Sequence, residues 1–126
     1  MKKQLAAIAC LGIGLAAAAG AHAESVCETA STHLLDALDK GDYAGATSDF
    51  NDIMKARQLP EKFGQLWPEM LQRFGERGPR DAAIVTPAGD RTLVLTTLHY
   101  GPNLIDAKVT CDAQGKVAGF FIQPHH

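Results

Sequence analysis

The sequence lacks an excess of positive charge: 12 lysines and arginines stand against 14 aspartates and glutamates, and the formal net charge is −2. Proteins that bind the nucleic-acid backbone carry a basic patch or stripe, so this composition argues against nucleic acid as a partner. The 126 residues suffice for one domain and not for two. A hydrophobic fraction of 46% is well above that of disordered chains and indicates a globular domain.

The sequence also lacks the short motifs of common catalytic and metal sites. It has no Cys-x-x-Cys pair and its histidines are scattered, so no metal site and no cofactor are expected. It has no Gly-x-Ser-x-Gly turn, which argues against an α/β-hydrolase. The pair His125-His126 is expected to be a disordered tail rather than a metal-binding site.

Residues 1–23 have the pattern of a cleaved secretory signal peptide. Two lysines precede an uncharged segment over residues 5–20, and the small residues Ala21 and Ala23 stand at the positions that a signal peptidase requires. We expect cleavage after Ala23, which leaves a single periplasmic or secreted domain of residues 24–126. Its slightly acidic charge argues weakly against anionic membranes as partners.

A transmembrane anchor and a lipoprotein signal are the two alternatives to a cleaved signal peptide. A transmembrane anchor needs about 20 apolar residues, whereas this segment has about 16 and no stop-transfer cluster follows it. A lipoprotein signal would place leucine three residues before the lipidated cysteine, but Ala7 stands at that position before Cys10. Cleavage without a membrane span or a lipid anchor is therefore the favoured interpretation.

The domain beyond Ala23 contains two cysteines, Cys27 and Cys111. An even number of cysteines in an exported chain indicates a disulfide, which would stabilise a domain of this size by about 4–5 kcal/mol. Two unpaired buried thiols are the alternative. The apolar pattern places both cysteines toward the core, which favours the disulfide.

Three helices are expected in the first half of the domain. The first spans residues 25–40, with Ser25 and Glu28 as a capping box. The second spans residues 42–57. The third spans residues 60–74, begins with a proline and contains Pro68, which should bend it.

Four strands are expected in the second half, because the apolar period changes from 3.6 to 2. They span residues 80–86, 91–100, 104–112 and 117–123, separated by short turns rich in glycine and proline. Such strands form an antiparallel meander with one face free to pack against helices. The sequence therefore predicts an α+β fold in which about three N-terminal helices cover one face of a four-stranded sheet.

Helices followed by a meander are the layout of cystatin-like and nuclear-transport-factor-like folds. A loose sequence motif points to one family with this layout. Residues 30–124 resemble the bacterial domain-of-unknown-function family number 3887. The matching residues are Gly41-Asp42-Tyr43, Phe50, Met54, Leu59-Pro60, Leu66, Trp67, Gly75, Gly115-Lys116-Val117-Ala118-Gly119-Phe120-Phe121 and Pro124. The resemblance implies a cystatin-like fold and an exported stand-alone member, and it supplies neither an activity nor catalytic residues.

We expect a non-catalytic module that binds a small apolar ligand or a partner protein. The candidate ligand site is a cleft between the helices and the sheet, lined by Trp67, His99 and Tyr100. A homodimer through the uncovered face of the sheet is a related expectation. The residues expected to make part of that face polar are Thr92, Thr96, Thr97, Lys108 and Thr110.

The alternative is a small enzyme of proton-transfer or hydrolytic type, suggested by analogy with cup-shaped folds of this kind. Its candidate residues are His99, Tyr100 and Asp106, with Tyr43 and His33 as further titratable groups. His99 and Tyr100 lie on opposite faces of their strand, so only one of them can face a given cleft. Asp106 is expected to be exposed on the polar face of its strand.

Overall fold

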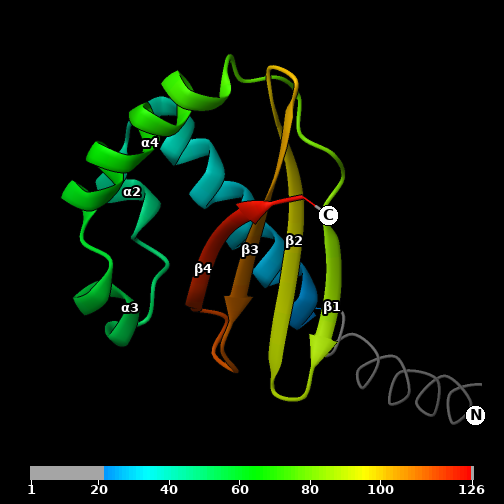
Figure 1. Cartoon of the computed structure of the whole chain (residues 1–126). Helices are drawn as coiled ribbons and strands as arrows, with labels where there is room; N and C mark the ends of the chain where they lie inside the picture. Colours follow the sequence, from blue (N-terminus) through cyan, green and yellow to red (C-terminus); the bar gives the residue numbers. More distant parts are fainter. Residues whose placement is uncertain (1–21, 126) are drawn as a thin grey trace, which may run out of the picture.

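A computed structural model describes residues 22–125 and shows an α+β fold in which helices precede a four-stranded antiparallel sheet (Figure 1). The predicted fold class and order of elements are thereby confirmed. Within residues 22–125, no helix has both the length and the apolar character to cross a membrane. The predicted signal segment up to residue 21 lies outside the described residues.

The N-terminal helix spans residues 22–40 and buries one face against the sheet. It begins before Ser25, so the predicted capping box at Ser25 and Glu28 is wrong. The helix ends at Gly41, whose φ of 77° lies in the left-handed region that glycine adopts without strain. Its buried residues are Cys27, Ala30, Ser31, Leu34, Leu35, Ala37 and Leu38.

The prediction of one helix over residues 42–57 is wrong, because the structure divides it into α2 (Tyr43–Ala46) and α3 (Asp52–Arg57). Between them Phe50 is buried and forms a parallel bridge with Val117 of the sheet. Asn51 then starts α3 by accepting a hydrogen bond from the backbone N–H of Met54 at 2.9 Å. A helix that ran through this point would lose both the bridge and the cap.

The helix α4 (Pro60–Phe74) confirms the third predicted helix. Proline at its first position lacks an N–H that would have no partner there. The helix buries Phe63 and Trp67 and lies beside β4, the last strand (Figure 1). Its Gly64 packs close to Tyr43 of α2, where an added Cβ would lie 3.4 Å from the tyrosine ring.

The strands β1 (Ile84–Ala88), β2 (Arg91–Tyr100), β3 (Asn103–Cys111) and β4 (Val117–Pro124) follow one another in the sheet, so β1 and β4 are its edges. The predicted bounds of β2 are confirmed, and those of β3 and β4 differ by a residue. The first strand starts at Ile84 rather than residue 80 and ends at Ala88 rather than residue 86, so it includes Pro87. An edge strand tolerates proline because its outer side needs no N–H donor.

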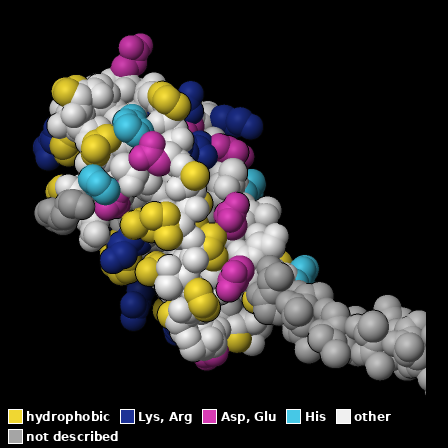
Figure 2. Space-filling view, turned by 90° about the vertical axis from the view of Figure 1, so that its right-hand side faces the viewer, with side chains coloured by type: hydrophobic (Ala, Val, Ile, Leu, Met, Phe, Trp, Pro, Cys, Tyr) yellow, Lys and Arg dark blue, Asp and Glu magenta, His cyan; other side chains and the backbone are white. Residues whose placement is uncertain are grey.

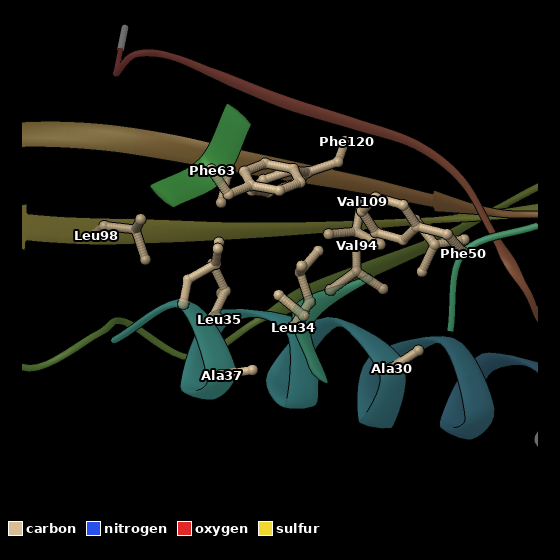
Figure 3. Close-up of a cluster of buried hydrophobic side chains, with 14 of the residues drawn as sticks. Ala30, Leu34, Leu35, Ala37, Phe50, Phe63, Val94, Leu98, Val109 and Phe120 are labelled. Atoms are coloured by element: carbon tan, nitrogen blue, oxygen red, sulfur yellow. The ribbon is translucent and has the colours of Figure 1, made fainter. Parts of the chain in front are cut away.

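The core lies between the helices and one face of the sheet (Figure 3). Leu34 and Leu35 of the N-terminal helix point toward the strands that carry Val94, Leu98 and Val109. The predicted disulfide is confirmed: Cys27 and Cys111 are joined across this layer with a Cα–Cα distance of 5.8 Å, and both are buried. It ties the first helix to β3.

Among residues 22–125, the helices lie on one face of the sheet only and leave the other face uncovered. Thr92 and Thr96, predicted for that face, instead point into the core and are 8% and 5% exposed, because the register of β2 places them with Val94 and Leu98. The uncovered face carries a row formed by Ile84, Leu95, Lys108 and Phe121, which are paired across the four strands. Figure 2 shows hydrophobic side chains gathered in the middle of the side on which β1 and β2 lie.

Candidate functional site: a groove between α4 and β4

An apolar groove of about 270 Å³ runs between α4 and β4. Its floor is formed by Phe63, Trp67 and Phe120, which are 5%, 4% and 8% exposed. The ring centroids of Phe63 and Phe120 lie 5.9 Å apart, so the helix and the strand are in direct contact below the groove. The remaining lining residues are Leu66, Glu69, Met70, Arg73, Phe74 and Ile122.

The groove follows from two apolar periods in the sequence. On α4, Phe63, Trp67 and Phe74 recur at helical spacing and turn toward the sheet. On β4, Phe120 and Ile122 lie on either side of the exposed Phe121 and turn toward the helices. Leu66 and Met70 belong to the same apolar stripe of α4 and widen it beyond these three residues. As a result Leu66, which is 58% exposed, forms a wall of the groove rather than part of the core.

The only charged residues in the lining are at the rim, where Arg73 and Glu69 lie 3.7 Å apart. Both side chains are exposed. An exposed pair at this distance is weak, and its charges largely offset each other. The groove therefore offers apolar contact without a strong preference for charge.

A second cavity of about 240 Å³ extends the groove past the end of α4. It shares Phe74 and Ile122 with the first and continues along β4 to Pro124. Its other lining residues are Asn103, Leu104, Ile105 and Gln123. The Asn103 side chain donates a hydrogen bond to the carbonyl of Phe74 at 2.8 Å, which holds the end of α4 against the turn before β3.

A buried polar network supports the floor of the groove from behind. The Asp39 carboxylate is 5% exposed and lies 2.8 Å from Arg77 and 2.9 Å from Arg80. The Trp67 indole N–H donates to its other oxygen at 3.4 Å. Two guanidinium groups and an indole thus compensate the buried charge of Asp39 and fix the orientation of Trp67.

Tyr100 lies behind Trp67 rather than in the groove. Their ring centroids are 6.5 Å apart in an edge arrangement, and Tyr100 is 1% exposed. Burial, with a smaller contribution from the charge of Asp39, raises the pKa of Tyr100 to about 12. The phenol is therefore neutral near pH 7 and faces the core, where it provides packing rather than acid–base chemistry.

The structure separates the three residues that we predicted for the cleft. Trp67 lines the groove and Tyr100 contacts Trp67 from behind. His99 lies on the uncovered face of the sheet, where its Nε2 is 2.8 Å from the Asp81 carboxylate. The prediction that His99 and Tyr100 lie on opposite faces is confirmed.

Asp106 is not the exposed carboxylate that we predicted, since it is 6% exposed. It accepts a hydrogen bond from the Thr97 hydroxyl at 2.8 Å, because the two residues are paired across β2 and β3. His125 Nδ1 lies 2.8 Å from the same carboxylate oxygen, so the prediction of a disordered tail is wrong for His125. The chain continues to pair with β3 beyond β4, through the His125 N–H and the Leu104 carbonyl.

Both histidine–aspartate pairs lie on the uncovered face of the sheet, away from the groove. In the described part of the chain, no three His, Cys, Asp or Glu side chains are arranged to hold a metal ion. His33 of the N-terminal helix, another titratable residue singled out in the sequence, is exposed and lies 3.0 Å from Asp49. None of these pairs includes a residue that lines the groove.

Comparisons with known proteins bring no match: no protein-family model, no curated protein and no solved structure is similar to this chain at a significant level. The resemblance to family 3887 and the cystatin-like designation stay predictions. The function must therefore be inferred from the groove and its surroundings.

Proposed function

We propose that this protein is an exported, non-catalytic binding module that holds an apolar group in the groove between α4 and β4. The observation that carries the proposal is the composition of the groove, in which a buried aromatic floor is flanked by an exposed leucine. Apolar cavities with few polar groups are the usual form of sites for apolar ligands. Binding of a ligand that removes the exposed Leu66 side chain from water is favoured, because burial of apolar surface lowers the free energy.

The groove supports binding better than catalysis. An acid–base site needs a titratable group at the reacting position, and the groove has charged side chains only at its solvent-exposed rim. The buried carboxylate of Asp39 lies behind the floor and is occupied by Arg77, Arg80 and Trp67. A catalytic role for His99 or Asp106 would need a different site, on the uncovered face of the sheet.

Export is part of the proposal. The Cys27–Cys111 disulfide is compatible with an oxidising compartment, since disulfides are rare in the reducing cytosol. Cleavage after Ala23 would leave the disulfide and the whole groove in the mature domain. Mass spectrometry of protein recovered from the bacterial periplasm tests this part: we expect loss of residues 1–23 and of two hydrogens at the cysteines. A full-length chain with free thiols would contradict it.

The binding proposal can be tested with Trp67, which is the only tryptophan of the chain and lines the groove. We expect anilinonaphthalene sulfonate, a fluorescent anion whose aromatic rings bind apolar surfaces, to bind with energy transfer from Trp67. The variant Leu66→Asp places a charge in the groove wall and should weaken binding at least tenfold, or about 1.4 kcal/mol.

The matched control is Ile53→Asp on α3, because Ile53 is 64% exposed and Leu66 is 58% exposed, while Ile53 does not line the groove. Both substitutions place a carboxylate at an exposed apolar position of a helix, so their effects on solubility should be similar. Equal binding by the two variants would show that the probe binds elsewhere and would contradict the proposal.

A further inference from the structure

We propose that the natural occupant of the groove is an extended peptide segment of a partner protein, which adds to β4 as a fifth strand. Alternate apolar side chains of the peptide would enter the groove while its backbone pairs with the outer edge of β4. This inference rests on the proposed function and names the class of partner. Strand addition is an established mode of peptide recognition, in which backbone hydrogen bonds provide affinity and pockets provide specificity.

The outer edge of β4 is already paired at its first residue. The Val117 N–H donates to the Asp49 carbonyl at 2.8 Å, and the Val117 carbonyl accepts from the Asn51 N–H at 2.9 Å. The chain then leaves the sheet to enter α3. From Ala118 to Gln123, no backbone group within residues 22–125 bonds to the outer edge of β4. The segment around Phe50 thus pairs with the edge of β4 at Val117 only, and the positions of a fifth strand beyond it are not filled by residues 22–125.

The length of the groove fits a short extended peptide. The segment of α4 from Phe63 to Phe74 spans about 16 Å, because each helical residue advances the chain by about 1.5 Å. An extended peptide advances by about 3.3 Å per residue, so about five residues would cover this distance. The second cavity, beyond Phe74 and Ile122, can receive one further side chain.

The chemistry of the site favours a peptide over a free lipid. A lipid chain would satisfy the apolar lining but would leave the outer backbone groups of β4 bonded to water, whereas a peptide would fill the groove and also pair with these groups. The rim charges of Glu69 and Arg73 offset each other, so selection depends on apolar side chains and not on charge. We therefore expect a segment in which large apolar residues alternate with polar ones.

The experiment uses eight-residue peptides in which valine, isoleucine, leucine or phenylalanine alternates with threonine and a lysine stands at each end. Binding is followed by the emission of Trp67 in the full mature domain, with Leu66→Asp and Ile53→Asp as site and control variants. Each binding peptide is then made in two N-methylated forms. One form methylates the odd-numbered residues and blocks one edge of the peptide, and the other blocks the opposite edge.

A peptide that adds to β4 uses one edge only. We expect one N-methylated form to bind at least about tenfold more weakly than the parent and the other to bind almost as well, because each lost hydrogen bond weakens binding several-fold. Equal binding of the two forms, or binding unaffected by Leu66→Asp, would overturn strand addition. Absence of binding by all four peptides would overturn it as well.

The outcomes separate this inference from the proposed function. If the fluorescent probe binds in the groove but the peptides do not, the groove is a site for apolar small molecules and only the inference fails. If decanoate binds more tightly than every peptide in a manner that depends on Leu66, a lipid is the occupant and the inference again fails. If neither probe nor peptide responds to Leu66→Asp, both proposals fail.

Discussion

The two edge strands of the sheet, β1 and β4, differ in their exposure and in what lies beside them. At β1, four of the five residues are exposed and Pro87 removes one backbone donor. At β4, the first residue is paired with the chain before α3, and the rest of the edge borders an apolar groove built by α4. Proteins commonly blunt or cover exposed edges to prevent unwanted pairing. β4 also ends in a proline, Pro124, so proline alone does not distinguish the two edges. Our proposal that β4 rather than β1 takes a partner rests on the groove and on the unpaired edge from Ala118 to Gln123.

The first test removes the disulfide and asks whether the β1 side and the β4 side of the sheet unfold together. The disulfide joins the N-terminal helix to β3, and its cysteines are 84 residues apart. Replacing both, as Cys27→Ala with Cys111→Ala, should lower the free energy of unfolding by about 4–5 kcal/mol. In urea denaturation, Trp67 fluorescence reports the β4 side, and far-ultraviolet circular dichroism reports the secondary structure of the whole domain. Coincident transitions are expected, and an early transition of Trp67 alone would show that the groove side unfolds separately.

The second test removes the support behind the groove. Asp39→Ala leaves Arg80 without one of its two carboxylate partners and frees the Trp67 indole, so we expect a loss of about 2–3 kcal/mol in unfolding free energy. Glu69→Ala at the exposed rim is the control and should change stability by less than about 0.5 kcal/mol. Urea denaturation measures both. Equal effects of the two substitutions would contradict the structural role of Asp39.

The third test uses pH on the same buried region. Because the pKa of Tyr100 is raised to about 12 and that of tyrosine in an unfolded chain is about 10, the unfolded state loses its proton first as pH rises. The stabilisation by Tyr100 is full below pH 10 and is lost between pH 10 and about 12, by as much as about 2.7 kcal/mol. Tyr100→Phe should remove this part of the pH dependence in urea denaturation. An unchanged profile would show that Tyr100 does not titrate as described.

The fourth test concerns the protected edge and has the smallest expected effect on stability. Pro87→Thr restores a backbone donor to β1 and should change the unfolding free energy by less than about 1 kcal/mol. We expect it to increase self-association in light scattering. Ala88→Thr is the matched control, because it also introduces a residue that favours strands but adds no backbone N–H donor. If both variants remain equally monodisperse, proline is not what protects β1.

The elements that local pattern determines were predicted well from the sequence. The bounds of β2 and α4 and the pairing of Cys27 with Cys111 follow from alternation, helical spacing and cysteine number. The break between α2 and α3 was missed, because it depends on the contact of Phe50 with Val117, 67 positions further along the chain. The start of β1 was missed because Arg80 turns to Asp36 and Asp39 instead of joining the strand.

The candidate site was only partly predictable. Trp67 was expected to pack in the core or, alternatively, to line a helix–sheet cleft, and it is both buried and part of the groove floor. His99 was assigned to the cleft, but it lies on the other side of the sheet. Leu66 belongs to the same apolar stripe as Trp67, and the spacing alone does not tell which of the two remains exposed. Which of the two side chains is buried depends on where the edge of the sheet lies beneath α4. Likewise, the burial of Asp106 depends on its pairing with Thr97 and on the return of His125, which are long-range contacts.

Hydrogen exchange of the backbone amides compares the two edges most directly. Amide exchange is measured residue by residue in the mature domain, with and without a saturating concentration of the tightest of the alternating peptides. We expect outer-edge amides between Ala118 and Gln123 to exchange about tenfold more slowly with peptide, and those of β1 to remain unchanged. Equal slowing at both edges, or none at β4, would contradict the claim that the groove beside β4 is a binding site for an extended segment.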